Sequence, residues 1–408
     1  MKKPKIRFKG YQEDDWEQRK LVDLVDRVTR KNQDLVSELP LTISAQYGLI
    51  DQNEFFDKRV ASKDVSGYYL IENGEFAYNK STSTDAPWGA IKRLDRYKNG
   101  VLSTLYIVFG IKENNPVDSD FLVSYYSTNL WHKGIHEIAA EGARNHGLLN
   151  IAPADFFETK LMIPQDIEEQ KKIGKYFEEL ERLITLHQRK CEETKTLKKY
   201  MLQKMFPQNG HSVPEIRFSG FTEDWEQRKF ADFTWDAGKR NKEDLDLEPY
   251  AITNEHGFIR QRDAHDDFGY MKDTDRKAYN IVQPNSFAYN PARINVGSIG
   301  YYKGVENVIV SSLYEVFQTD NYVNDRFLWH WLKSDEFPRW IEKLQEGSVR
   351  LYFYYDKLCE CQLYMPSLEE QEKIATFLDD LDHLITLHQH KCEELQNIKK
   401  FMLKNMFI

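Results

Sequence analysis

Two stretches of the chain place apolar residues in alternating steps of four and three, and both stretches predict long helices. The first, residues 167–206, contains no proline and one glycine, Gly174, and is rich in residues of high helix propensity. Spacing of this kind forms the seam along which helices pack in coiled coils. The seam residues are Ile173, Phe177, Leu180, Ile184, His187, Cys191 and Thr194 in the first stretch, and Ile374, Leu378, Leu381, Ile385, His388, Cys392 and Leu395 in the second.

Each stretch of about forty residues predicts a rod of about 60 Å, at ~1.5 Å per residue. A lone amphipathic rod of that length would expose its apolar stripe, so we expect the two rods to pack on each other. If a two-fold axis relates the halves of the chain, the rods run antiparallel.

The two stretches belong to a repeat that covers the whole chain. LITLHQRKCEE begins at Leu183, and LITLHQHKCEE begins 201 positions later at Leu384. FAYN occurs at Phe76 and again 211 positions later at Phe287, and the segments around Pro4 and Pro214 also match. Two copies of one fold with different loop lengths explain why the offset between matching segments changes from 211 to 201. A solenoid would instead repeat every ~20–50 residues. Between the matching landmarks the sequences differ greatly, as expected for two recognition heads that bind different ligands.

The repeat predicts five segments. A first head (1–165) and a helix (166–206) are followed by a linker (207–213), whose proline, Asn-Gly pair and polar residues mark a break. A second head (214–367) and a second helix (368–408) complete the repeat. In each head a β-branched and aromatic run predicts strands, at 102–111 and 308–317, and a later run predicts helices, at 120–140 and 325–345. The expected fold class is therefore α+β: two mixed α/β heads in pseudo-two-fold tandem repeat, joined by two long helices in an antiparallel coiled coil.

Composition narrows the class of protein only slightly. The 408 residues are 41% hydrophobic, enough for folded cores, and the four cysteines are too few for a disulfide framework. We find no signal peptide and no run of ~18 apolar residues, so we expect a cytoplasmic protein without membrane spans. The net charge of −9 neither identifies nor excludes a nucleic-acid partner.

Motifs for catalysis are absent from the sequence. There is no Gly-rich phosphate loop and no metalloprotease motif, and Asn290-Pro291-Ala292-Arg293 lacks the second proline of an amino-methyltransferase motif. Cys359 and Cys361 lie in a run that we interpret as strand-like and structural.

The seam itself contains a possible metal site. His187 and Cys191 are four residues apart on one helix face, as are His388 and Cys392, and two His with two Cys could bind tetrahedral zinc. Packing is the preferred interpretation, because cysteine is commonly a small buried residue, and we expect no metal here.

The ordered duplication resembles the DNA-specificity subunit of type I restriction–modification systems. The matching features are a Glu-Gly pair in each head (Glu141-Gly142 and Glu346-Gly347) and a proline before Glu-Glu-Gln at the start of each helix (Pro164 with Glu168-Glu169-Gln170, and Pro366 with Glu369-Glu370-Gln371). The resemblance implies a non-catalytic subunit in which each head reads half of a bipartite, asymmetric DNA site. It also implies two adenine methyltransferase subunits and ATP-driven restriction subunits as partners. S-adenosylmethionine, ATP and Mg²⁺ would then belong to those partners, and this chain would bind no cofactor.

Polar loops that differ between the heads are the expected DNA contacts. Arginine pairs with guanine and asparagine with adenine, while other basic groups contact phosphate. The candidates are Lys80, Ser81, Thr82, Arg144, Asn145 and His146 in the first head, and Arg293, Asn295, Ser298, Arg350 and Tyr352 in the second.

Two other functions remain open at this point. A two-headed scaffold could bind two protein partners through the same loops without reading DNA. A self-sufficient methyltransferase is opposed by the missing cofactor motif.

Overall fold

The structure is a computed structural model that describes residues 3–408, except 45–46, 59, 85, 114–116, 140–143, 146, 209, 255–256, 265–275 and 348–350. The backbone of Arg144 and Asn145 is described without their side chains. The chain divides into two units: unit 1 combines Met1–Gln188 with His390–Ile408, and unit 2 is Arg189–Gln389. Each unit therefore contains one head, the beginning of one long helix and the end of the other.

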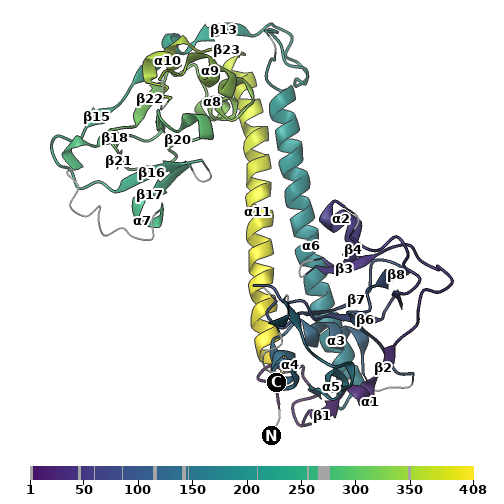
Figure 1. Ribbon diagram of the computed structural model, residues 1–408. Coiled ribbons are helices and arrows are strands. Elements are labelled where there is room, and N and C mark those ends of the chain that lie inside the picture. The colour runs from purple at the N-terminus through teal and green to yellow at the C-terminus, as the bar shows by residue number, and fades with distance from the viewer. Residues whose placement is uncertain are drawn as a thin grey trace. The chain divides into compact units, whose positions relative to one another are not determined.

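Unit 1 contains the first head and its short helices (Figure 1). Its strands are β1 (Glu17–Lys20), β2 (Val25–Val28), β3 (Leu41–Ser44), β4 (Gly48–Asp51), β5 (Tyr69–Glu72), β6 (Phe76–Asn79), β7 (Ala90–Arg93), β8 (Asn99–Leu102), β9 (Ile107–Ile111), β10 (Arg144–Asn145), β11 (Leu148–Leu149) and β12 (Lys160–Ile163). Its helices are α1 (Leu21–Leu24), α2 (Gln52–Phe56), α3 (Ser119–Tyr126), α4 (Leu130–Ile138), α5 (Pro153–Phe157) and the first part of α6 (Ile167–Lys204).

Unit 2 contains the second head and uses the same kinds of element. Its strands are β13 (Glu226–Lys229), β14 (Thr234–Asp236), β15 (Lys239–Arg240), β16 (Pro249–Thr253), β17 (Gly257–Arg260), β18 (Asn280–Val282), β19 (Phe287–Tyr289), β20 (Ile299–Tyr301), β21 (Val308–Val310), β22 (Glu315–Thr319) and β23 (Gln362–Met365). Its helices are α7 (Gln261–Ala264), α8 (Asp325–Leu332), α9 (Glu336–Leu344), α10 (Tyr355–Glu360) and most of α11 (Leu368–Met406), with short 3₁₀ turns η1 (Phe230–Asp232), η3 (Arg276–Ala278) and η4 (Ile294–Val296).

The repeat seen in the sequence is a repeat of topology. The four-stranded sheet β2-β9-β6-β7 of unit 1 corresponds to β14-β22-β19-β20 of unit 2, and the pair β1-β12 corresponds to β13-β23. The register is kept as well: Phe76 faces Phe109 and Phe287 faces Phe317, with the rings stacked at centroid distances of 5.3 and 4.9 Å. Equivalent FAYN segments therefore form the same central strand in both heads.

Each head is completed by the end of the long helix that began in the other unit. Phe407 is buried in the core of unit 1, where its ring lies 5.6 Å from Phe121 and 5.7 Å from Phe177. Phe206 occupies the matching place in unit 2, 5.4 Å from Phe327. An aromatic side chain buried in this way contributes about 3–5 kcal/mol, judged by the usual effect of truncating one to alanine.

Both long helices accept an equivalent backbone hydrogen bond close to their C-terminal ends. The amide of Ile216 donates to the carbonyl of Lys204 at 2.9 Å, directly after the linker in unit 2. The amide of Ile6 donates to the carbonyl of Asn405 at 3.0 Å in unit 1, although these residues are far apart in sequence.

The two long helices run antiparallel where they pair inside each unit. In unit 2 the Cys191 thiol lies 3.9 Å from the carbonyl oxygen of Ile385, and Lys198 Nζ lies 2.6 Å from Asp382, so advancing along α6 means moving back along α11. In unit 1 the pairs Phe177–Phe407 and Glu181–Lys399 follow the same order. The predicted fold class, with two mixed α/β heads in tandem and two long antiparallel helices, is confirmed.

The 4-3 seam residues lie on the packed faces of these helices. Ile173, Phe177, Leu180 and Ile184 are buried in the core of unit 1, and Ile374, Leu378 and Leu381 are buried in the core of unit 2. Cys191 is also buried, whereas His187, Ile385, His388 and Cys392 are partly exposed.

Two details concern the remaining sequence predictions. Cys359 lies in helix α10 and Cys361 directly precedes strand β23, so the strand-like interpretation was wrong for Cys359. Leu358, one turn into α10, is fully buried, and packing of that side chain fixes a helical turn where local sequence favours a strand. Among the described residues, no helix combines the length and apolar character needed to cross a membrane.

Candidate nucleic-acid interface

The loop that follows FAYN in the first head pairs with the segment that follows the Glu-Gly pair. The amide of Thr82 donates to the carbonyl of Gly147 at 2.7 Å, and the Thr82 hydroxyl donates to the same oxygen at 3.0 Å. The amide of Leu149 donates to the carbonyl of Lys80 at 3.0 Å, and Ser81 forms a bridge with Leu148. The loop after FAYN is therefore held by backbone hydrogen bonds against the segment that directly follows the second group of candidate DNA-contacting residues.

The second head repeats this arrangement. Pro291, like Lys80, is the first residue after FAYN, and its carbonyl accepts a hydrogen bond of 3.1 Å from the amide of Phe353. The neighbouring Tyr352 exchanges two backbone hydrogen bonds with Glu346, at 2.7 and 2.9 Å. Gly347, directly after Glu346, has a φ of +132°, which lies in a region that favours glycine.

The candidate side chains in the first loop differ in exposure. Ser81 is exposed, and Lys80 is half-buried with its Nζ 3.4 Å from the carbonyl of Ile151. Burial lowers the pKa of Lys80 from its ordinary value. Its aliphatic part thus packs on the head, as lysine side chains commonly do at a surface.

Two candidates of the second head are exposed and one is buried. Arg293 and Asn295 lie at the turn η4 with their side chains exposed. Ser298 is only 4% exposed, and its hydroxyl donates to the carbonyl of Ile252 at 2.8 Å. Its hydrogen bond anchors the loop to strand β16, so we assign Ser298 to packing.

The sequence patterns did not predict that Tyr352 forms a stacked aromatic pair with Tyr354. The rings of Tyr352 and Tyr354 are stacked with their centroids 5.5 Å apart, and Tyr354 is 48% exposed. The run of aromatic residues in LYFYYDK was the available signal, because residues two apart in an extended segment, such as Tyr352 and Tyr354, face the same side.

Several candidates lie outside the described residues. These are the side chains of Arg144 and Asn145, together with His146, Arg350 and the first Glu-Gly pair, Glu141-Gly142. The backbone of Arg144 and Asn145 forms strand β10, which pairs with β11.

The Glu-Glu-Gln motif fixes the head to the start of each long helix. Glu169 accepts two hydrogen bonds from Arg7, at 2.6 and 2.8 Å, and both side chains are almost fully buried. Gln170 accepts from the amide of Asp118 at 2.8 Å and donates to the carbonyl of Pro164 at 2.8 Å. The glutamine thus connects the beginning of α3, whose cap is Asp118, to the beginning of α6.

Unit 2 contains the same contacts. Glu370 accepts from Arg217 at 2.7 and 2.8 Å, and Gln371 joins the amide of Asn324 at 2.8 Å to the carbonyl of Pro366 at 3.0 Å. The motif is therefore structural in both copies, and a buried, bidentate pair explains why its second residue is glutamate.

Among the described residues, one group of three potential metal ligands comes together, and its two carboxylates already form ion pairs with basic side chains. It consists of His330, Asp379 and Asp382. Asp379 lies 3.0 Å from both His330 Nε2 and Arg326, and Asp382 pairs with Lys198 at 2.6 Å. Burial lowers the pKa of His330 and favours the neutral ring. We interpret the cluster as a polar contact between α8 and α11.

The comparisons with known proteins agree with these features. The sequence matches the family described as the type I restriction modification DNA specificity domain over residues 13–196 and again over residues 222–397. It is 23% identical over 325 residues to the type I restriction enzyme MjaVIII specificity subunit of Methanocaldococcus jannaschii, covering 74% of this chain and 72% of that protein.

A solved structure shares the fold along the entire chain. The S subunit of a type I restriction–modification system from M. genitalium aligns with a TM-score of 0.62 at 14% identity, covering 100% of this chain and 99% of that one. At this identity the likeness concerns the fold.

Proposed function

The chain belongs to the type I restriction modification DNA specificity domain family, and from this premise we propose that each of its heads reads one half of a bipartite DNA target. The observation that carries the proposal is the loop pairing found twice, at Lys80–Leu149 and at Pro291–Phe353. Both heads present their most divergent segments on the same backbone frame. Such a frame suits two readers of different sequences.

Arg293 is the candidate whose contact can be tested most directly. Its side chain is exposed in a loop fixed by the backbone hydrogen bonds of Asn290 and Ser298 with Arg293, at 3.0 and 3.2 Å. Arg293→Ala should weaken binding to the target by about 1–3 kcal/mol and relax one position of the half-site, if the guanidinium pairs with guanine. Equal weakening on all duplexes would assign Arg293 to phosphate. No change on any duplex would remove it from the interface.

The long helices offer equivalent apolar residues to two copies of one partner. Leu197 and Tyr200 on α6 are 41% and 47% exposed, and their repeat equivalents Ile398 and Phe401 on α11 are 36% and 57% exposed. Residues three apart lie on one helix face, so each unit presents the same exposed apolar pair. We assign these faces to two adenine methyltransferase subunits, one for each unit.

Stoichiometry tests this assignment. Phe401→Lys or Tyr200→Lys should each remove one methyltransferase subunit from the complex, and the double variant should remove both, as measured by native mass spectrometry. Leu313→Lys is the control, because Leu313 is 76% exposed and lies away from these helices in sequence and element. Retention of two subunits by the double variant would contradict the assignment.

The chemistry belongs to the partners in this proposal. S-adenosylmethionine would be bound by the methyltransferase subunits, and ATP and Mg²⁺ by the restriction subunits, in the cytoplasm. The purified chain alone should transfer no methyl group to DNA, and the assembled complex should methylate adenine in both half-sites. Binding of two proteins with no preference among duplexes would instead favour a two-headed scaffold.

A further inference from the structure

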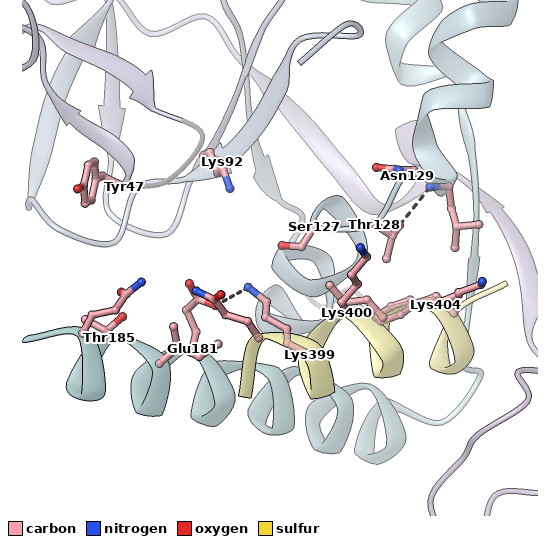
Figure 2. A pocket seen from close by; sticks show the side chains of 16 residues that line it. Tyr47, Lys92, Ser127, Thr128, Asn129, Glu181, Thr185, Lys399, Lys400 and Lys404 are labelled. Carbon is pink, nitrogen blue, oxygen red and sulfur yellow. Dashed lines mark hydrogen bonds and ion pairs between the residues drawn. The ribbon is translucent and has the colours of Figure 1, made fainter. Parts of the chain in front are cut away.

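Unit 1 contains a groove of about 840 Å³ between strand β7, the end of α3 and the paired parts of α6 and α11 (Figure 2). Much of its polar lining consists of groups that donate hydrogen bonds. These are Tyr47, Lys92, Asn129, Lys399, Lys400 and Lys404.

The groove has an excess of positive charge. Four lysines and one carboxylate, Glu181, line it, which leaves three net positive charges. Lys399 forms an ion pair with Glu181. Within the part of the chain that the structure describes, Lys92, Lys400 and Lys404 have no carboxylate partner.

Lys92 gives the clearest indication of an anionic ligand. It extends from β7 toward the helices, on the side where Glu181 and Lys399 lie (Figure 2). Burial lowers the pKa of Lys92 and the charge of Lys399 lowers it further, while the charge of Glu181 raises it by less than these two lower it. Because Glu181 forms its ion pair with Lys399, its charge is shared, and an anion in the groove would lower the cost of burying the Lys92 ammonium group.

Unit 2 provides an internal comparison, because two of the four lysines are replaced there. Lys404 and Asn129 correspond to Gln203 and Asp335, which are joined by a hydrogen bond of 2.9 Å. Lys92 corresponds to Gly300, as the registers Ala77–Lys92 and Ala288–Gly300 show.

Gly300 excludes any side chain at this position of unit 2. A Cβ there would lie 2.7 Å from the ring of Phe258. Lys92 and Lys404 are therefore particular to unit 1, whereas Lys399 and Lys400 have lysine equivalents in unit 2, Lys198 and Lys199.

The groove also adjoins the loop that we propose to read DNA. Ala90 on β7 pairs with Asn79, the residue directly before Lys80. Lys92 is two residues further along the same strand, about 7 Å at ~3.3 Å per residue.

We propose that this groove binds the phosphodiester backbone of the target DNA next to the half-site read by the first head. The proposal rests on the proposed function. Lysine ammonium groups only donate hydrogen bonds, and phosphate oxygens only accept them, so the lining matches a DNA backbone in charge and in hydrogen-bonding sense. The contact adds affinity without sequence information.

The test uses the assembled methyltransferase complex and a duplex that carries the methylated site of the host. The variants are Lys92→Gln, Lys400→Gln and their combination. Each lost phosphate contact should lower the slope of log affinity against log salt by about 0.9, and the combination should weaken binding about 10-fold at low salt. Target and non-target duplexes should lose affinity equally, and the methylated sequence should stay the same. Lys400→Arg should keep the wild-type slope.

Lys199→Gln is the matched control, because Lys199 is the repeat equivalent of Lys400 in unit 2 and is also exposed. It should leave both slope and affinity unchanged. Wild-type slopes in the Lys92→Gln, Lys400→Gln combination would overturn the proposal, as would a loss of methyltransferase assembly with normal DNA slopes, which would make the groove a protein site. Failure of the proposed function is a different result: the wild-type complex itself would then show no preference among duplexes.

Discussion

Lengthening both long helices at the boundary between the units should lengthen the gap between the half-sites. The boundary falls after Gln188 in α6 and after Gln389 in α11, which are repeat equivalents and each end a Thr-Leu-His-Gln sequence. Duplicating that tetrapeptide in both helices leaves the contacts inside each unit intact. Phe177–Phe407 and Phe206–Phe327 lie on one side or the other of the insertions.

The size of the effect follows from helix geometry. Four residues add ~6 Å to each helix and rotate it by ~40° beyond a full turn, since one turn takes 3.6 residues. An insertion of four residues, called a stutter in coiled coils, shifts the seam locally without interrupting the contact between the helices. At ~3.4 Å per base pair, 6 Å corresponds to nearly two base pairs. Methylome sequencing of a host that carries the variant should therefore reveal both half-sites unchanged and a longer gap.

A single insertion provides the control. Four residues added only after Gln188 would lengthen α6 but not α11 at the boundary. The pairs Glu181–Lys399 and Lys198–Asp382, which lie on opposite sides of the insertion, could then not both keep their register. We expect that variant to lose stability and methylation. An active double variant whose gap has the wild-type length would refute the idea that the two long helices set the spacing of the half-sites.

Three further predictions concern the heads and their anchors. Exchanging residues 22–160 for the matching region of a relative should change one half-site in the methylome, and a change in both would contradict independent readers. Glu370→Gln should lower the free energy of unfolding of unit 2 by about 2–4 kcal/mol, because Arg217 would stay buried without its counterion. Urea unfolding followed by hydrogen exchange measures this free energy. The control is Glu369→Gln, at an exposed neighbouring residue, which should change the free energy by less than about 0.5 kcal/mol. Burial, with a smaller contribution from a nearby lysine, lowers the pKa of Lys333 from 10.5 to about 8. Between about pH 8 and pH 10.5 the lysine is therefore protonated in the unfolded chain and neutral in the folded chain. Because the unfolded chain binds more protons in this range, stability rises with pH across it. Lys333→Met should raise the free energy of unfolding at pH 7 by about 1–3 kcal/mol and abolish that rise in thermal melts from pH 7 to 11, whereas an unchanged pH profile would contradict the assignment.

The sequence predicted the fold well because its strongest signals are local and repeated. The 4-3 spacing of Ile173, Phe177 and Leu180 follows from helix periodicity alone, and the same spacing in the second copy confirms the pattern. The role of Glu169 could not be predicted in this way. Its partner Arg7 is 162 residues away, and no periodicity connects a loop residue to a distant helix start.

The candidate site was predicted in outline and not in detail. Divergence between the copies identified the loops after FAYN, and the structure joins them to the segments after the Glu-Gly pairs. Ser298 looked exposed because serine commonly occurs in loops, but a hydrogen bond to Ile252 from another strand buries it. The lysine groove combines residues from β7 and α11, Lys92 and Lys400, which are more than 300 positions apart in sequence.

The burial of Phe407 in the core of unit 1 sets the order in which the heads can finish folding during synthesis. The ribosome translates Phe407 230 residues after Phe177, one of its neighbours in that core, which takes roughly 10–50 s at about 5–20 residues per second. Phe206, in contrast, is already made before the head of unit 2 that it completes. The head that is translated first therefore waits longest for its last core residue. During that interval the empty site for Phe407 is open to the matching helix end of another nascent chain, and two copies translated side by side on one messenger can exchange helix ends before either has closed its own.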